Sequence, residues 1–536
     1  MSLKPRAMSL KPIAINSRPN ETNLKLSEKS LKISTTSKKQ SPIANMLTYG
    51  LGLVLNKGIS LIMLPFMASY LQPQQIGKLD LLASIGAASG IVIALAMHEV
   101  LYRFVGTEKQ TANQFKRASE LYSSTCMIAV VISLVLFSII NLIPFPADFL
   151  VSKVELNLLL VCASLDGILG LSTAWLRMQD KAKTFLVISV LSTTLQVGLI
   201  VVVLTTQPTV INILACGAIT YAVQFFALHA INHFEWRLPS KTQFKKHLSY
   251  GIPLMLTAFV GFGLNGSERF FLAYNTDLNT LGLYAVAIKF SFAMCILMQP
   301  FGMWWMPKRF QYINEHGVKK TCTVTQLGIS YLTALTIFVA FSAKVFISLA
   351  LPESYTISIQ LLIGTLLVAW FKELSELVNI GVLYNKNTQQ QFRVSFVSTL
   401  IGLGLMWGLG NELGIWGIII SLGIAQALKA VSIYTLSQRQ LFMPYQIKFL
   451  TINIVCLLVF LYVAFHVSDL WLCAILALLS PIVALLPTLL IKEVNQWVTH
   501  KALNRNNSSL STSNCSLRRN NNALYTSKTS NCRSDG

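Results

Sequence analysis

Charged residues are scarce in this 536-residue chain, because Asp, Glu, Lys and Arg make up only 12% of it, against about a quarter of a soluble globular domain. Catalytic signatures are also missing: the sequence contains no serine elbow, HExxH, phosphate-binding glycine loop or DxD. The nine cysteines are scattered without a CxxC pair, and the seven histidines form no metal-ligand cluster. These absences exclude a soluble globular enzyme and predict neither a cofactor nor a metal.

Long hydrophobic segments take the place of these features. Hydrophobic residues make up 53% of the chain, and the mean hydropathy is +0.58. A helix needs about 20 mostly apolar residues to cross a bilayer. Segments of this kind lie at 44–66, 79–97, 121–143, 155–175, 184–204, 209–230, 248–273, 281–303, 324–343, 357–380, 394–411, 414–434, 449–466 and 470–491. We therefore predict an all-α polytopic membrane protein with about fourteen transmembrane helices.

The net charge of +22 is unevenly distributed. The loops on the N-terminal side of the predicted membrane hold nineteen Lys and Arg, whereas those on the opposite side hold Lys78, Lys153 and Lys344. By the positive-inside rule, both termini are expected to be cytoplasmic. The basic, Ser- and Asn-rich tails suit anionic lipid headgroups, so we predict no nucleic-acid partner. Because Met-Ser-Leu-Lys-Pro occurs at both Met1 and Met8, either methionine can be the start.

The chain also contains an internal repeat. Leu47–Leu51 is echoed by Leu248–Ile252, Ile76-Gly77 by Leu281-Gly282, and Arg103-Phe104 by Arg309-Phe310, at offsets of 201, 205 and 206. Duplicated halves are typical of alternating-access transporters. We predict two pseudo-symmetric six-helix lobes plus two C-terminal helices. The expected parts are a disordered basic tail (1–43), an N-terminal lobe (44–230), a linker (231–247), a C-terminal lobe (248–440), two extra helices (441–492) and a disordered tail (493–536).

Short loops argue against a membrane-embedded enzyme. The longest predicted external connections, 144–154 and 344–356, are too short to fold as an acceptor-binding domain. A membrane glycosyltransferase or acyltransferase is therefore disfavoured, and the lack of a nucleotide-binding domain excludes an ATP-driven pump. A secondary transporter or a lipid translocase remains.

Two groups of motifs resemble a known family. In the first half they are Asn56-Lys57-Gly58, Leu64-Pro65-Phe66, Ala68–Pro73 and Ile76-Gly77. In the second half they are Tyr250–Pro253, Leu264–Phe270, Leu281–Tyr284, Ala287–Lys289 and Trp305-Met306-Pro307. These motifs resemble the polysaccharide-biosynthesis transporters of the multidrug/oligosaccharidyl-lipid/polysaccharide exporter superfamily, most closely the Wzx-type O-antigen flippases. Gln72-Pro73 stands where the family usually has Ser-Pro, Ile76 where it has Tyr, and Glu268-Arg269 where it has Asp-Arg.

The resemblance covers roughly 44–440 and implies a function. Such flippases carry polyprenyl-pyrophosphate-linked oligosaccharides between membrane leaflets for O-antigen, capsule or exopolysaccharide synthesis. The implied partners are this lipid-linked oligosaccharide, membrane lipids, a polysaccharide polymerase and a chain-length regulator. A cation-coupled multidrug antiporter of the same superfamily is the alternative, and it would favour an acidic cleft.

Cations inside the apolar segments are the first candidates for substrate binding, because burying a charge in a membrane is costly. A guanidinium also binds phosphate oxygens through two hydrogen bonds. The candidates in these segments are Lys57, Arg269 and Lys289, with Glu268 as the neighbour of Arg269. Arg103 and Arg309 are candidates at the cytoplasmic entrance, where they can meet headgroup phosphates. The alternatives are a structural ion pair for Lys57 and Lys289, interfacial anchoring for Glu268, and ordinary cytoplasmic basic residues for Arg103 and Arg309.

Carboxylates within the segments are candidates for ion coupling. Glu373 and Glu376 are three residues apart and share a helical face, on which mutual repulsion favours a bound H⁺ or Na⁺. A water-exposed helix end would explain them equally well. Asp166 is a candidate partner for Lys57 or Lys289, or else a helix–helix hydrogen-bond point.

Overall fold

The computed structural model describes residues 58–490 except 107, 109, 147–149 and 385–387, and its regular structure within that range is helical. After the helix Gly58–Tyr70 come α3 (Pro73–Ala94), α4 (Met97–Phe104), α5 (Thr111–Leu142), α6 (Lys153–Met178), α7 (Ala182–Thr206), α8 (Val210–Asn232), α9 (Lys241–Phe262), α10 (Glu268–Asn275), α11 (Leu278–Trp305), α12 (Arg309–Ala350), η1 (Glu353–Tyr355), α13 (Ser358–Val378), α14 (Ile380–Tyr384), α15 (Thr388–Gln440), α16 (Ile447–His466), α17 (Leu470–Leu485) and η2 (Leu486–Leu490).

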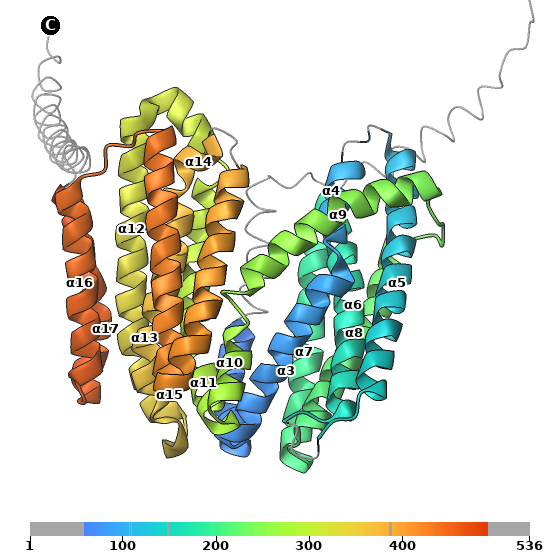
Figure 1. Cartoon of the computed structure of the whole chain (residues 1–536), viewed down its shortest axis with the longest axis horizontal. Coiled ribbons are helices and arrows are strands. Elements are labelled where there is room, and N and C mark those ends of the chain that lie inside the picture. Colours follow the sequence, from blue (N-terminus) through green and yellow to red (C-terminus); the bar gives the residue numbers. More distant parts are fainter. Residues whose placement is uncertain (1–57, 107, 109, 147–149, 385–387, 491–536) are drawn as a thin grey trace, which may run out of the picture.

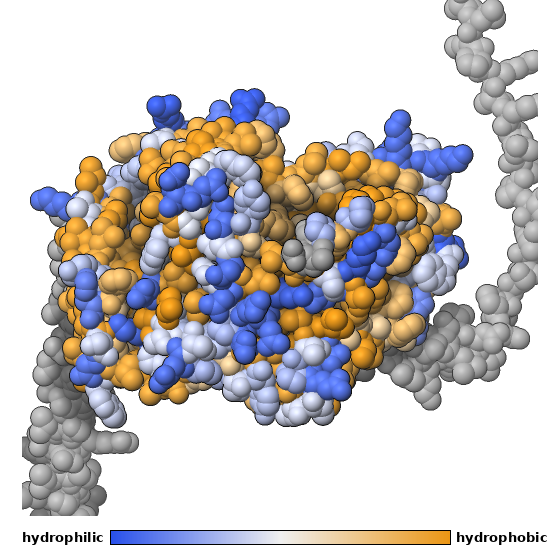
Figure 2. Space-filling model, turned by 60° about the horizontal axis from the view of Figure 1, so that its bottom comes forward, coloured by the Kyte–Doolittle hydropathy of each residue, from blue (hydrophilic) through white to orange (hydrophobic). Residues whose placement is uncertain are grey.

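The helices form two bundles that lean together at one end (Figure 1). The first bundle holds α3–α8, and the second holds α10–α15, with α16 and α17 packed on α12. α9 runs obliquely between the bundles at the end that carries α4 and α14 (Figure 1). We call this end the basic face, because the basic connections of the sequence lie there. Hydrophobic residues cover the flanks of the molecule, and hydrophilic residues gather on the face opposite the basic face (Figure 2).

The predicted class of fold is confirmed. Within the described residues, eleven helices are long and apolar enough to cross a membrane, and one of them is the 53-residue α15. Gly414, with a φ of 58°, breaks α15 into the predicted hairpin. A Cβ on Gly417 would lie 1.9 Å from the Leu409 carbonyl oxygen, so the two arms meet closely at this turn. The predicted tails and most of the predicted first span lie outside the described residues.

Three details differ from the sequence-based expectations. The expected span 248–273 is interrupted, since α9 ends at Phe262 and α10 begins at Glu268. The expected span 79–97 is interrupted by Leu95 and Ala96, which are both left-handed. Lys344, expected in a loop, is buried near the end of α12, where its ammonium donates hydrogen bonds to the carbonyls of Ala464 (2.8 Å) and Val467.

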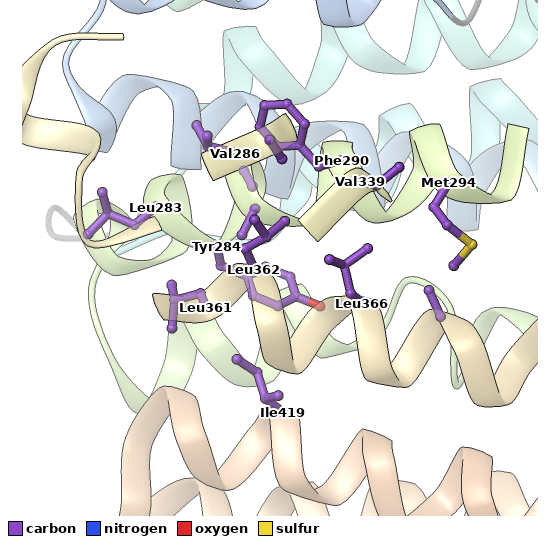
Figure 3. Close-up of a cluster of buried hydrophobic side chains, with 14 of the residues drawn as sticks. Leu283, Tyr284, Val286, Phe290, Met294, Val339, Leu361, Leu362, Leu366 and Ile419 are labelled. Atoms are coloured by element: carbon purple, nitrogen blue, oxygen red, sulfur yellow. The ribbon is translucent and has the colours of Figure 1, made fainter. Parts of the chain in front are cut away.

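The second bundle has a dense apolar core. Leu283, Tyr284, Phe290 and Met294 of α11 pack against α12, α13 and α15, with Leu362 and Leu366 of α13 at the centre (Figure 3). These side chains are almost fully inaccessible to solvent. The core holds α11 rigidly, and α11 carries residues of both the inter-bundle contact and the candidate site.

The two bundles meet through a reciprocal pair of glycines, which we call the glycine seam. Gly77 lies near the start of α3, and Gly282, its counterpart in the internal repeat, lies near the start of α11. A Cβ on Gly77 would lie 2.0 Å from the carbonyl oxygen of Leu278, and one on Gly282 would lie 1.9 Å from that of Pro73. The backbones therefore touch at the end away from the basic face, and neither position has room for a side chain.

The glycine seam predicts a position-specific effect of a single methyl group. We expect Gly282→Ala to lower the stability of the protein by about 1–3 kcal/mol, the usual cost of overpacking. Gly302→Ala is the matched control, because Gly302 lies in the same helix with nothing within 4 Å of its Cβ position. Thermal unfolding of both variants in detergent checks this expectation. Equal melting temperatures for the two variants would contradict the close approach.

Candidate ligand chamber

A cavity of about 780 Å³ lies between the helix Gly58–Tyr70 of the first half and α11 and α13 of the second. On α11 its lining runs from Lys289 to Gln299. At a rise of about 1.5 Å per residue, Lys289 is about 16 Å from the first residue of α11, and Gln299 is closer to the basic face. The cavity therefore begins near mid-depth and extends toward the basic face. We call it the chamber.

Lys289 lies at the deep end of the chamber. Its side chain is partly buried and makes no hydrogen bond or ion pair with any residue that the structure describes. The carboxylate whose electric field acts on the Lys289 ammonium is that of Asp80 of α3. An unpaired ammonium at this depth is available to an anionic ligand.

The chamber is also lined by Lys372 and Glu373 of α13, which are neighbours in the sequence and carry opposite charges. Glu373 and Glu376 are predicted to share one helical face, but only Glu373 lines the chamber. Glu376 accepts a hydrogen bond from Asn379 Nδ2 (3.0 Å), and Asn379 Oδ1 accepts one from Arg309 Nη1 (2.8 Å). Glu376 therefore belongs to a network that ties the start of α12 to the end of α13.

Beyond Lys289, toward the opposite face, lies a buried group of charges. Arg269 of α10 donates from Nε to Asp80 Oδ2 of α3 (2.9 Å) and from Nη1 to Glu268 Oε1. Tyr284 also donates to Glu268 Oε1 (3.4 Å). The Arg269 side chain is only 7% exposed. Because Asp80 belongs to the first bundle and the other three residues to the second, this group, the inter-bundle ion pair, links the bundles next to the glycine seam.

Two other contacts between the halves support the same closure. Ser84 of α3 donates to the carbonyl of Gly266 (2.5 Å), and the Tyr355 hydroxyl donates to the carbonyl of Leu71 (2.7 Å). The guanidinium of Arg269 also lies 5.9 Å from the centre of the Phe292 ring, which lines the chamber. In this conformation Arg269 thus lies just outside the chamber and is paired with protein carboxylates.

A second cavity, of about 420 Å³, lies inside the first bundle and contains Asp166. Its polar lining includes Thr173, Gln196, Tyr221 and Gln224, and Asp166 makes no ion pair or hydrogen bond with the described residues. Ser60 lines both this cavity and the chamber, so the helix Gly58–Tyr70 separates the two. Asp166 and Lys289 are therefore on different cavities and are not paired.

The remaining predicted site residues are Lys57, Arg103 and Arg309. Lys57 lies outside the described residues, next in sequence to Gly58, which lines the chamber. Arg103 is exposed in the last turn of α4. Its repeat counterpart Arg309 is buried, with its guanidinium 4.9 Å from the Phe310 ring centre. The shared pattern in the sequence therefore leads to one exposed and one buried arginine.

Asp80 and Lys429 are not among the site residues predicted from the sequence. Asp80 is the partner of Arg269, 189 positions away. Lys429 lies within α15 and lines a further cavity between α9 and α15. Both residues fall inside the predicted apolar segments 79–97 and 414–434, so the rule that selected Lys289 would also have selected them.

Comparisons with known proteins agree with this arrangement. The sequence profile of the family described as polysaccharide biosynthesis protein matches residues 43–312. A comparison with curated proteins gives no match. Among solved structures, the lipid II flippase MurJ in an inward closed conformation is similar, with a TM-score of 0.66 and 13% identity over 84% of this chain and 99% of the flippase.

Two structures of multidrug resistance MATE family transporters of the MOP superfamily are also similar. The inward-facing one has a TM-score of 0.54 and 12% identity over 74% of this chain and 94% of the transporter. The outward-facing one has a TM-score of 0.50 and 13% identity over 74% of this chain and 95% of the transporter. These likenesses show a shared fold.

Removing Asp80 should loosen the contact between the bundles. We expect Asp80→Asn to weaken closure, because a hydrogen bond to a charged group contributes about 1.5–3 kcal/mol, which corresponds to a change of about tenfold or more in the open-to-closed ratio. Spin labels at Gln207 and Glu412, which are exposed at the face away from the basic face, would report the separation of the bundles after replacement of the native cysteines.

Glu155→Gln is the control for this measurement. It breaks an ion pair of Glu155 with Lys78 (2.9 Å) that lies within the first bundle, between α3 and α6. We expect this variant to lose stability without any change in the distance between the labels. An unchanged distance distribution in Asp80→Asn would mean that the inter-bundle ion pair does not hold the bundles together.

Proposed function

This chain belongs to the polysaccharide biosynthesis protein family, and from that premise we propose that it is a flippase. Its substrate in this proposal is a polyprenyl-pyrophosphate-linked oligosaccharide, moved between leaflets without chemical conversion for O-antigen, capsule or exopolysaccharide synthesis. The observation that carries the proposal is a chamber between the two halves that is lined by two unpaired lysines, with Lys289 near mid-depth and Lys372 closer to the basic face. The MurJ-like fold supports it.

The chamber has the chemistry that a pyrophosphate headgroup needs. Lys289 and Lys372 both line it, and neither makes an ion pair with the described residues. Ammonium groups bind phosphate oxygens through charge-assisted hydrogen bonds, which are about twice as strong as neutral ones. The apolar polyprenyl chain needs no such groups and stays in the lipid. Lys57, next to Gly58, and Arg269, once released from Asp80, are further ligands in this proposal.

The inter-bundle contacts suit one state of an alternating-access cycle. The glycine seam and the inter-bundle ion pair lie toward the face opposite the basic one. By the positive-inside rule the basic face is cytoplasmic, with both termini on that side of the inner membrane. The present conformation then corresponds to a state closed on the external side. Transport requires rupture of the seam and closure around Arg103 and α9 at the cytoplasmic side.

Coupling to H⁺ or Na⁺ belongs to the same proposal. Glu373 lies in the chamber beside Lys372, so a cation bound to Glu373 changes the local charge that an anionic substrate meets. Glu376 stands one turn further along α13, and Asp166 offers a separate acidic site. A polysaccharide polymerase and a chain-length regulator are the proposed protein partners.

A cation-coupled multidrug antiporter is the second candidate function. The Asp166 cavity favours it, because an unpaired carboxylate in a polar pocket suits a cationic compound. The fold shared with the multidrug transporters is compatible with it. The larger chamber favours the flippase, since its two unpaired lysines would repel a cationic drug.

Neutralising Lys289 should reduce transport of the lipid-linked oligosaccharide. Loss of a charged hydrogen bond of about 1.5–3 kcal/mol predicts a fall of at least about tenfold in apparent affinity for Lys289→Gln. Flipping of a fluorescent polyprenyl-pyrophosphate oligosaccharide in proteoliposomes measures this fall. Lys245→Gln, on the exposed basic face, is the control and should flip normally. Equal rates for the two variants, at equal protein levels, would reject the proposed headgroup site.

Drug resistance separates the two candidate functions. We expect overexpression of the protein to leave the resistance of cells to ethidium unchanged, because the two lysines of the chamber disfavour a large organic cation, while deletion removes surface polysaccharide. Growth in ethidium and polysaccharide staining check both expectations. Ethidium efflux that depends on Asp166, shown by its loss in Asp166→Asn, would establish the antiporter instead.

A further inference from the structure

A cavity of about 270 Å³ lies where α9 packs on the second bundle, and none of the preceding assignments uses it. It lies between α9 and α15, and it shares no lining residue with the chamber. Its polar lining consists of Thr257, Asn265, Gln391, Ser395, Thr399 and Lys429. These are one cation, two amides and three hydroxyls, without a carboxylate.

Lys429 is the charged group of this cavity. It lies fifteen residues beyond the Gly414 turn and eleven before Gln440, which places it about 22 Å and about 16 Å from the two ends of its helix arm. A lysine stem of about 6 Å cannot carry the ammonium to either membrane surface over these distances. Lys429 makes no hydrogen bond or ion pair with the residues that the structure describes.

Several polar neighbours of Lys429 also have unused hydrogen-bonding capacity. The Gln391 amide and the Ser395 hydroxyl have no hydrogen bond to the described residues. Asn265 uses its Nδ2 on the Gly261 carbonyl (2.8 Å), which leaves its carboxamide oxygen as an acceptor. Lys429, Gln391 and Ser395 are partly buried, whereas Asn265 is exposed. Their free donors and acceptors suit a ligand that is both anionic and rich in hydroxyls.

The cavity is also linked to the chamber by charge. Lys372, which lines the chamber, and Glu376 are the ionisable groups whose fields act on Lys429, and both lie on α13. The volume is below the roughly 300–1,000 Å³ typical of pockets for drug-sized ligands, so it suits a single sugar ring.

We infer that this cavity is a subsite for one acidic sugar of the substrate, with Lys429 bound to its carboxylate or phosphoryl group and Gln391, Ser395 and Asn265 hydrogen-bonded to its hydroxyls. The inference rests on the proposed flippase function, and it narrows the substrate to an oligosaccharide that contains an acidic residue. Neutral repeat units would leave Lys429 without a partner.

Binding of soluble sugars to the purified full-length protein tests the subsite. The probes are glucuronate, glucose 6-phosphate, glucose and inorganic phosphate, titrated by ligand-observed NMR. We expect both acidic sugars to bind more tightly than glucose, and Lys429→Gln to weaken them by about tenfold. Lys429→Arg should retain binding, and Gln391→Ala should weaken all three sugars. Lys245→Gln is the control for a lost surface charge, and thermal unfolding verifies that each variant is folded.

Each outcome decides one part of the inference. Tighter binding of glucuronate than of glucose 6-phosphate, or the reverse, assigns the charge to a carboxylate or to a phosphoryl group. Equal binding of glucuronate and glucose, or binding that is unchanged in Lys429→Gln, overturns the acidic-sugar subsite. Inorganic phosphate that binds as tightly as the acidic sugars overturns the sugar part.

The binding experiment can fail independently of the flippase proposal. The flippase proposal is tested by comparing the flipping rates of the wild-type protein and Lys289→Gln, a comparison that does not involve Lys429. Absence of flipping by the wild-type protein would reject the proposed function while the sugar titration still decided the subsite. Normal flipping with no dependence of acidic-sugar binding on Lys429 would reject the subsite alone.

Discussion

The rest of the structure depends on the backbone contact between Gly77 and Gly282. Because each glycine lies against a carbonyl of the opposite helix, α3 and α11 approach closely at one end of the molecule. This approach brings Asp80 of α3 within hydrogen-bond distance of Arg269. It also determines where the bundles can separate, which is toward the basic face, where the chamber lies. A side chain at either glycine would move apart the two helices that carry the buried charges.

The two halves of the repeat share a backbone contact but differ in their charged side chains. Gly77 and Gly282 retain equivalent places and make the symmetric contact, but Arg103 is exposed while Arg309 is buried and hydrogen-bonded to Asn379. The first bundle holds an acidic cavity around Asp166, whereas the second contributes Lys289, Lys372 and Lys429 to its cavities. The duplicated backbone makes the contact between the bundles. Side chains that differ between the two halves make one cavity acidic and place lysines in the others.

The sequence predicts what depends on local composition. Runs of apolar residues predict the helices, and the short turn Gly410-Asn411-Glu412 predicts the hairpin of α15. The depth of Lys289 in its segment predicts its place away from the surface. What it cannot predict depends on partners far along the chain. Arg269 was expected to meet a ligand, yet Asp80, 189 positions earlier, reaches it first in this conformation. Likewise, the break between α9 and α10 follows from how Gly263 and Gly266 pack, against Thr399 and Phe262, rather than from hydropathy.

Paired and unpaired cations affect the conformational equilibrium of the two bundles in different ways. Arg269 is matched by two carboxylates, so its burial stabilises one arrangement of the bundles. Lys289, Lys372 and Lys429 have no such match among the described residues, and an unmatched charge within a membrane raises the free energy of the protein. An anionic ligand offsets that cost only while it occupies the cavities. Since a ligand shifts a conformational equilibrium only through its different affinity for the two states, unpaired lysines beside a closed seam give an anionic substrate the means to bias the bundles.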